Sequence, residues 1–122
     1  MIAELKGIIS PDTCNLEAYL PADPGNFSLL LQVMVGLKNQ DGHESFDITV
    51  CTPIWLNSIL ESDGAMVGQH FLFVRQYDYP LIVDKIRRFL SHCSGDCWSA
   101  VAEKVSHLGH WEFDAYVLTD EK

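Results

Sequence analysis

The sequence of 122 residues is 48% hydrophobic and 20% charged, which supports a packed core and argues against intrinsic disorder. Its 17 Asp and Glu residues outnumber its 8 Lys and Arg residues, for a formal net charge of −9. Because nucleic acids and anionic membranes are bound mainly through Lys and Arg, this balance disfavours both as partners. The length fits one domain, and we expect residues 1–122 to form it.

The hydrophobic runs are short. None approaches the roughly 20 residues that a membrane helix needs, and the first residues lack the basic and apolar regions of a signal peptide. Cysteines without a secretory signal are expected to be free thiols rather than disulfides. We therefore expect a cytoplasmic protein whose thiols are Cys14, Cys51, Cys93 and Cys97.

Three strands are predicted in the first half of the chain. Residues 2–9 form the first, and a loop rich in Pro and Gly follows over residues 11–26. Residues 27–38 alternate with period two, and their second face is also partly apolar, which predicts a central strand. An Asp-Gly turn signal then leads into a third strand, residues 44–51. These last two strands are expected to form a β-hairpin.

Thr52 and Pro53 are typical of a helix start, because Thr accepts hydrogen bonds at the N-cap and Pro is tolerated at the first helical position. The helix that follows is short and fades by residue 60, and it places Trp55 where it can pack on the sheet. Residues 61–69 contain two glycines and are expected to form a loop.

Residues 70–76 alternate as a fourth strand, and Pro80 begins a second, amphipathic helix. A Ser-Gly step predicts the end of that helix, and Asp96 is the expected N-cap of a third. The tail, residues 110–118, is expected to form a strand or an irregular packed segment. This order predicts an α+β fold, with a mostly antiparallel sheet of about four to five strands and two to three helices packed on one face.

Two combinations of Cys and His residues are weighed as chemical sites. Cys51, His70 and Asp47 provide the groups of a nucleophilic site, but any chain with 4 Cys and 5 His contains such a set. A zinc site is disfavoured by the Cys-x3-Cys spacing, which is not that of a zinc knuckle, and its ligands would come from His92, Cys93, Cys97, His107 and His110. We therefore predict no enzyme, metal or cofactor, with a small Cys- and His-dependent enzyme or metal-binding module as the alternative.

Acidic residues occur in two stretches that lack Lys and Arg, one between Lys38 and Arg75 and the other over residues 105–121. Charge of one sign attracts a partner of the other sign, whereas the alternative is a role in solubility alone. Trp111 is the best candidate for an exposed or half-exposed aromatic anchor, and packing on the core as an edge-strand residue is its alternative. The candidate binding residues are Asp41, Glu44, Asp47, Glu61, Asp63, Trp111, Glu112 and Asp114.

Four strings of residues resemble the immunity protein 8 family, and the likeness runs from residue 3 to residue 116. They are Asn26-Phe-Ser-Leu-Leu-Leu-Gln-Val33, Glu44-Ser-Phe-Asp-Ile-Thr-Val-Cys-Thr-Pro-Ile-Trp-Leu56, Ser94-Gly-Asp-Cys-Trp-Ser-Ala-Val-Ala-Glu-Lys-Val105 and Gly109-His-Trp-Glu-Phe-Asp-Ala-Tyr116. The family-like positions within them are Phe46, Asp47, Trp55, Trp98, Trp111, Glu112 and Phe113, most of which the periodicity assigns to packing.

The resemblance implies an α+β antidote encoded beside a bacterial polymorphic toxin, including toxins of contact-dependent growth inhibition systems. Such a protein binds the C-terminal toxin domain of its own lineage in the cytoplasm. We expect a monomer that forms a 1:1 complex with the toxin, which is expected to be a nuclease because a basic nuclease cleft would attract carboxylates. A third hypothesis is a general adaptor domain that binds no toxin, and only the identity of the neighbouring gene would distinguish it from an immunity protein.

Overall fold

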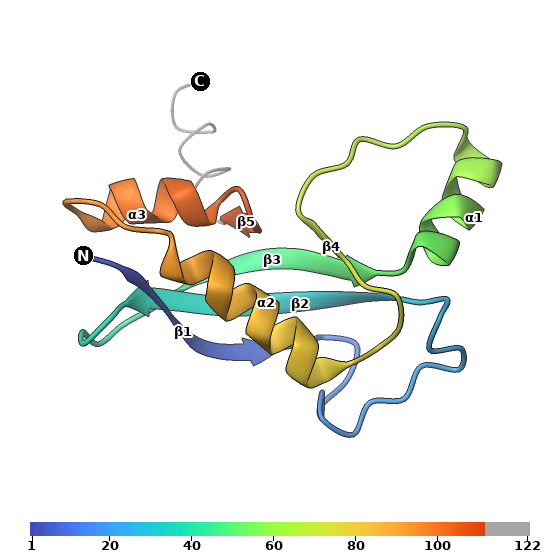
Figure 1. Cartoon of the computed structure of the whole chain (residues 1–122), viewed down its shortest axis with the longest axis horizontal. Helices are drawn as coiled ribbons and strands as arrows, with labels where there is room; N and C mark the ends of the chain where they lie inside the picture. Colours follow the sequence, from blue (N-terminus) through green and yellow to red (C-terminus); the bar gives the residue numbers. More distant parts are fainter. Residues whose placement is uncertain (112–122) are drawn as a thin grey trace.

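The computed structural model describes residues 1–111, which form one sheet with two of their three helices packed on one of its faces (Figure 1). The strands are β1 (Ala3–Ile9), β2 (Ser28–Leu37), β3 (Glu44–Cys51), β4 (Phe71–Phe73) and β5 (His110–Trp111). The helices are α1 (Pro53–Asp63), α2 (Tyr79–Ser91) and α3 (Trp98–Val105). The predicted α+β class is confirmed.

The sheet is antiparallel except at one edge. Its order is β1-β2-β3-β4, and β5 pairs with β3 beside β4. Strand β4 runs parallel to β3 next to Thr49, whereas β5 runs antiparallel to it next to Phe46. The outer edge of β3 is therefore shared by two short strands that come from distant parts of the chain.

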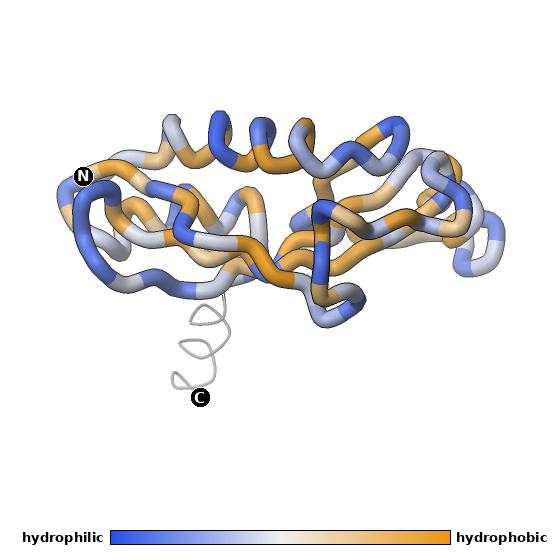
Figure 2. Tube along the Cα trace, turned by 90° about the horizontal axis from the view of Figure 1, so that it is seen from below, coloured by the Kyte–Doolittle hydropathy of each residue, from blue (hydrophilic) through white to orange (hydrophobic). Residues whose placement is uncertain are grey.

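The core lies between the sheet and the helices α2 and α3. Figure 2 shows α2 along one side of the sheet, with its hydrophobic residues turned toward the strands. The alternation of β2 and β3 points one set of side chains into this core, where each is at most 1% exposed: Leu29, Leu31, Val33, Val35, Phe46, Ile48 and Val50. The helices complete it with Ile82, Ile86, Leu90, Val101, Ala102 and Val105.

The helix boundaries differ from those predicted in three places. Helix α1 continues to Asp63, where Gly64 adopts φ 80° and caps it. Helix α2 ends at Ser91, several residues before the Ser-Gly step. The prediction of Asp96 as an N-cap is wrong: Cys97 is the N-cap of α3 and makes no side-chain capping bond. Residue 97 is extended (φ −148°), so Asp96 lies one residue outside the position from which a side chain caps a helix.

The predicted strand over residues 70–76 is shorter in the structure. Only Phe71–Phe73 form β4, and they pair parallel to β3. Parallel pairing requires a crossover connection between the strands, and here α1 and the loop after it provide that connection. Of the predicted tail strand, His110 and Trp111 pair with β3, and residues 112–118 lie outside the described part of the chain.

Thr52 joins β3 to α1 and is fully buried. Its hydroxyl oxygen accepts hydrogen bonds from the backbone N–H of Phe27, at 3.2 Å, and of Trp55, at 3.4 Å. The first bond anchors the start of β2, and the second caps α1. The predicted N-cap is therefore confirmed, and the same oxygen also holds the sheet to the helix.

We expect Thr52→Val, which keeps the shape of the side chain and removes the hydroxyl, to lower the free energy of unfolding by about 2 kcal/mol. The loss has two sources: α1 loses its N-cap bond, and the buried N–H of Phe27 loses its acceptor. Thr52→Ser keeps the hydroxyl and is expected to cost less than half as much. Urea unfolding measures both variants, and a loss for Thr52→Val no larger than that for Thr52→Ser would show that the hydroxyl contributes little to stability.

Candidate functional site

The predicted acidic residues between Asp41 and Asp63 do not form one surface. Asp41 lies in the turn between β2 and β3, whereas Glu61 and Asp63 lie in the last turn of α1, beyond the other end of β3 (Figure 1). The eight residues of β3 span about 26 Å, which separates the two groups. Asp47 lies between them, half-buried, opposite Gln32 on β2 and His110 on β5.

The carboxylate of Glu44 accepts hydrogen bonds from two tryptophans. Its Oε2 atom accepts a hydrogen bond from the indole Nε1 of Trp98, at 2.5 Å, and another from that of Trp111, at 2.9 Å. Both indole rings lie against Phe46, with centroid distances of 6.4 Å and 6.1 Å. Glu44 therefore joins α3, β3 and β5, and its Oε2 atom is already engaged within the protein.

Trp111, predicted as an exposed or half-exposed anchor, is half-buried and stacks on Phe46. Among the described residues, Trp111 therefore packs on the core, which was the alternative prediction for it. Glu112 and Asp114, the other predicted binding residues of the tail, lie outside the described residues. The hydrogen bonds of Glu44 could not be found from spacing alone, because they join residues 54 and 67 positions apart.

The thiol of Cys51 is buried, although its place on the polar face of the predicted strand did not require this. Burial raises the pKa of the Cys51 thiol to about 11. The thiol is therefore protonated at neutral pH, and the protonated form is not the nucleophile. The ring of His70, its predicted partner, lies with Nε2 at 2.9 Å from the carbonyl oxygen of Ser106.

Cys93 and Cys97 occupy different environments. Cys93 is buried and donates to the carbonyl of Phe89 at 3.4 Å, whereas Cys97 is exposed with its sulfur 3.3 Å from the hydroxyl of Ser99. Burial raises the pKa of Cys93, and the hydrogen bond with Ser99 lowers that of Cys97. Within residues 1–111, no three His, Cys, Asp or Glu side chains come together as a possible metal site.

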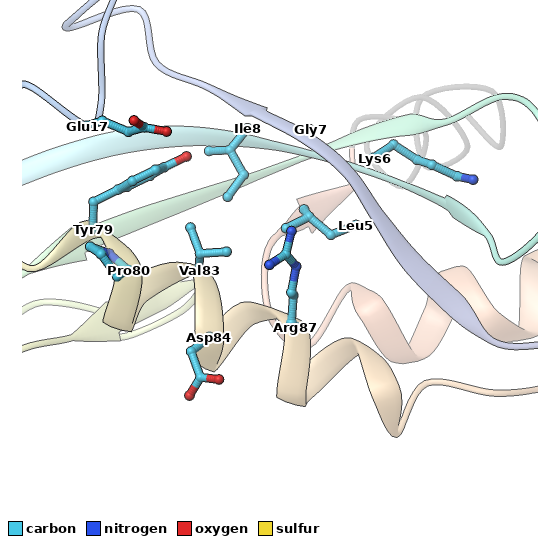
Figure 3. Close-up of a pocket in the computed structure, with 10 residues that line it drawn as sticks. All are labelled: Leu5, Lys6, Gly7, Ile8, Glu17, Tyr79, Pro80, Val83, Asp84 and Arg87. Carbon is cyan, nitrogen blue, oxygen red and sulfur yellow. The ribbon is translucent and has the colours of Figure 1, made fainter.

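An open groove of about 810 Å³ lies between the free edge of β1 and helix α2 (Figure 3). In Figure 3, Arg87 points into this groove toward β1, whereas Asp84 points away from it. Strand β1 carries a bulge between Leu5 and Gly7, and bulges of this kind hinder an edge strand from pairing with another chain. The groove is thus bordered by both charge signs and by an irregular strand edge.

The segment of residues 53–69, the α1 arm, consists of α1 and the loop that returns to β4. No residue of α1 is buried, which contrasts with the three buried residues in each of α2 and α3. Trp55 is half-buried rather than part of the core. The sequence contained a signal for this outcome. Ile54, Trp55 and Leu56 are consecutive, so they spread around a helix instead of marking one face.

The family model for immunity protein 8 matches residues 3–116 of the chain. The protein belongs to the immunity protein 8 family. The resemblance noted in the sequence is therefore confirmed over its whole extent, and this immunity protein is expected from its family to bind a cognate toxin. No curated protein and no solved structure matches the chain. Among residues 1–111, none of the helices has the length and apolar character to cross a membrane.

We expect Glu44→Ala to lower the free energy of unfolding by about 2 kcal/mol, because two half-buried indole N–H groups lose a charged acceptor. The matched control is Asp41→Ala, a nearby exposed carboxylate, which is expected to change stability by less than about 0.5 kcal/mol. Urea unfolding followed by tryptophan fluorescence measures both. Equal stability of the two variants would show that the Glu44 cluster is not structural.

A thiol reagent at neutral pH is expected to modify Cys14 and Cys97 in the folded protein and to reach Cys51 and Cys93 only after unfolding. Cys97 should react first, because its pKa is lowered and the thiolate is the reactive form. The Cys97→Ser variant should lack the fastest phase. Rapid modification of native Cys51 would instead restore it as a candidate nucleophile.

Proposed function

We propose that this immunity protein neutralises a nuclease toxin domain by covering its active or substrate-binding surface. The observation that carries the proposal is the charge distribution within a family of toxin-binding proteins. The chain has no Lys or Arg between Lys38 and Arg75, and its net charge is −9. A nuclease binds phosphates through cationic side chains, so its substrate surface attracts carboxylates.

The carboxylates available for this contact are those that the fold leaves at the surface. Asp41, Glu61 and Asp63 are exposed, and Asp47 is half-exposed on β3. Glu112 and Asp114 remain part of the proposal from the sequence, whereas Glu44 and Trp111 would act indirectly, by holding α3 and β5 against β3.

Inhibition of this kind requires no chemistry from the immunity protein. Covering the cleft excludes the nucleic acid, and complementary charge raises the rate at which the two proteins meet. The complex would form 1:1 in the cytoplasm with the C-terminal toxin domain encoded beside this gene, as in contact-dependent inhibition systems. The immunity protein would act as a single domain and not as an enzyme.

The toxin domain encoded beside this gene is expected to cleave nucleic acid and to stop doing so at equimolar immunity protein. The four reversals Asp41→Lys, Asp47→Lys, Glu61→Lys and Asp63→Lys together should slow association at least about tenfold, and rising salt should slow the wild type. Stopped-flow mixing measures the rates.

The matched control reverses four other exposed acids and so has the same net charge: Glu17→Lys, Asp84→Lys, Asp96→Lys and Glu103→Lys. Its association rate should stay closer to that of the wild type. Equal rates for the two variants would reject a localised electrostatic contact. A toxin domain that cleaves no nucleic acid would reject the nuclease assignment.

A further inference from the structure

Helix α1 lacks the support that holds the other helices. Among residues 1–111, the hydrogen bonds of the α1 arm stay within the arm or reach only Thr52, and no residue of α1 is buried. A helix of 11 residues is shorter than the roughly 12 to 15 residues that an isolated helix needs to be even marginally stable in water. Contact with a further surface, one not formed by residues 1–111, would therefore stabilise α1.

The arm presents apolar side chains that are only partly covered. Trp55 and Ile59, and likewise Leu56 and Leu60, are four positions apart, so the two pairs share one side of α1. The first three of these are half-buried and Leu60 is 37% exposed, whereas Ile54, on another side of the helix, is 60% exposed. The loop after the helix adds Val67, which is 83% exposed. Such a side is typical of a helix that enters a hydrophobic hollow on a partner.

The charges of α1 oppose its own stability. Glu61 and Asp63 lie in its last turn, where the helix carbonyls already carry partial negative charge. No basic residue occupies that turn, and no acidic residue occupies the first turn. A partner with cations at this position would relieve the repulsion, so the charge that weakens the free helix would favour a basic partner.

Both ends of the arm are fixed to the sheet. Thr52 holds the start of α1, and at the far end the carbonyl of His70 accepts the N–H of Thr49 at 2.9 Å. His70 has a left-handed backbone (φ 62°), which turns the chain from the loop into β4. Figure 1 shows α1 beyond the end of β3, away from α2 and α3, and the loop after it curving back to β4. The sheet thus presents the arm as a protruding loop with fixed ends.

We propose that the α1 arm is the element that docks the toxin. Its apolar side enters a hollow on the toxin domain, and Lys or Arg residues at the rim of that hollow contact Glu61 and Asp63. The assignment rests on the proposed function, since the occupant is the toxin, and it selects one of the two separated acidic groups. Neither Asp41 at the hairpin nor the groove beside β1, which is bordered by both charge signs, has this combination of apolar surface and uncompensated acid.

The double variant Glu61→Lys with Asp63→Lys separates docking from folding, because it should weaken toxin binding without lowering the thermal stability of the protein. Its thermal midpoint should equal or exceed that of the wild type, since cations suit the end of the helix. Its affinity for the toxin domain should fall at least about tenfold. The matched control is Asp96→Lys with Glu103→Lys, two exposed acids outside the arm, and it should bind within about threefold of the wild type.

A second variant tests the apolar side. Leu56→Ala with Leu60→Ala removes partly exposed side chains, so the protein should fold as before while toxin affinity falls at least about tenfold. Hydrogen exchange supplies an independent measurement: amides of α1 should exchange rapidly in the free protein and be protected in the complex.

The outcomes distinguish the docking surface from the function itself. A wild-type protein that does not bind the toxin domain would reject the proposed function. A wild-type protein that binds it, while the arm variants bind as tightly as the control and the amides of α1 stay unprotected in the complex, would overturn the assignment of the arm alone.

Discussion

The antiparallel pairing of β2 with β3 is the interaction on which the rest of the molecule depends. Leu31 lies opposite Ile48 and Val33 opposite Phe46, so the inward side chains of both strands form one continuous apolar face. Strand β1 pairs with the free side of β2, and β4 and β5 share the free side of β3. The helices α2 and α3 bury their apolar residues on the face that this pairing creates. A shift of one residue in the register would turn that face toward solvent.

The exposed position of α1 follows from the same topology. Strand β4 is parallel to β3, so the chain must cross over after Cys51 before it can pair again. In many folds the crossover helix packs on the sheet, but here α2 and α3 occupy the core face with residues such as Ile86 and Val101, which are fully buried. The crossover therefore extends beyond the end of the sheet. The same strand arrangement thus produces a fully packed core and leaves α1 with no buried residue.

Local chemistry in the sequence predicted local structure well. The alternation over residues 27–38 and 44–51 identified the hairpin, and Thr52 with Pro53 identified the start of α1, because these signals depend on a few adjacent residues. Contacts between distant segments could not be predicted in this way. The parallel pairing of β4 and the hydrogen bonds of Glu44 to two tryptophans exist only once the sheet has assembled. The separation of Asp41 from Glu61, by contrast, follows from the length of the predicted strand over residues 44–51, because the two acids lie beyond its opposite ends.

The acidity of the chain consequently has two different physical roles. Glu44 has a structural role: its Oε2 atom accepts hydrogen bonds from two indole N–H groups, and removing it would take this charged acceptor away from both. Glu61 and Asp63 have the opposite character, because they lie where the helix dipole disfavours negative charge and no base offsets them. An acid that stabilises the free protein needs no partner to explain its position. Two acids that destabilise the helix bearing them, beside an apolar side that the described chain covers only in part, are better explained by the toxin that the family binds.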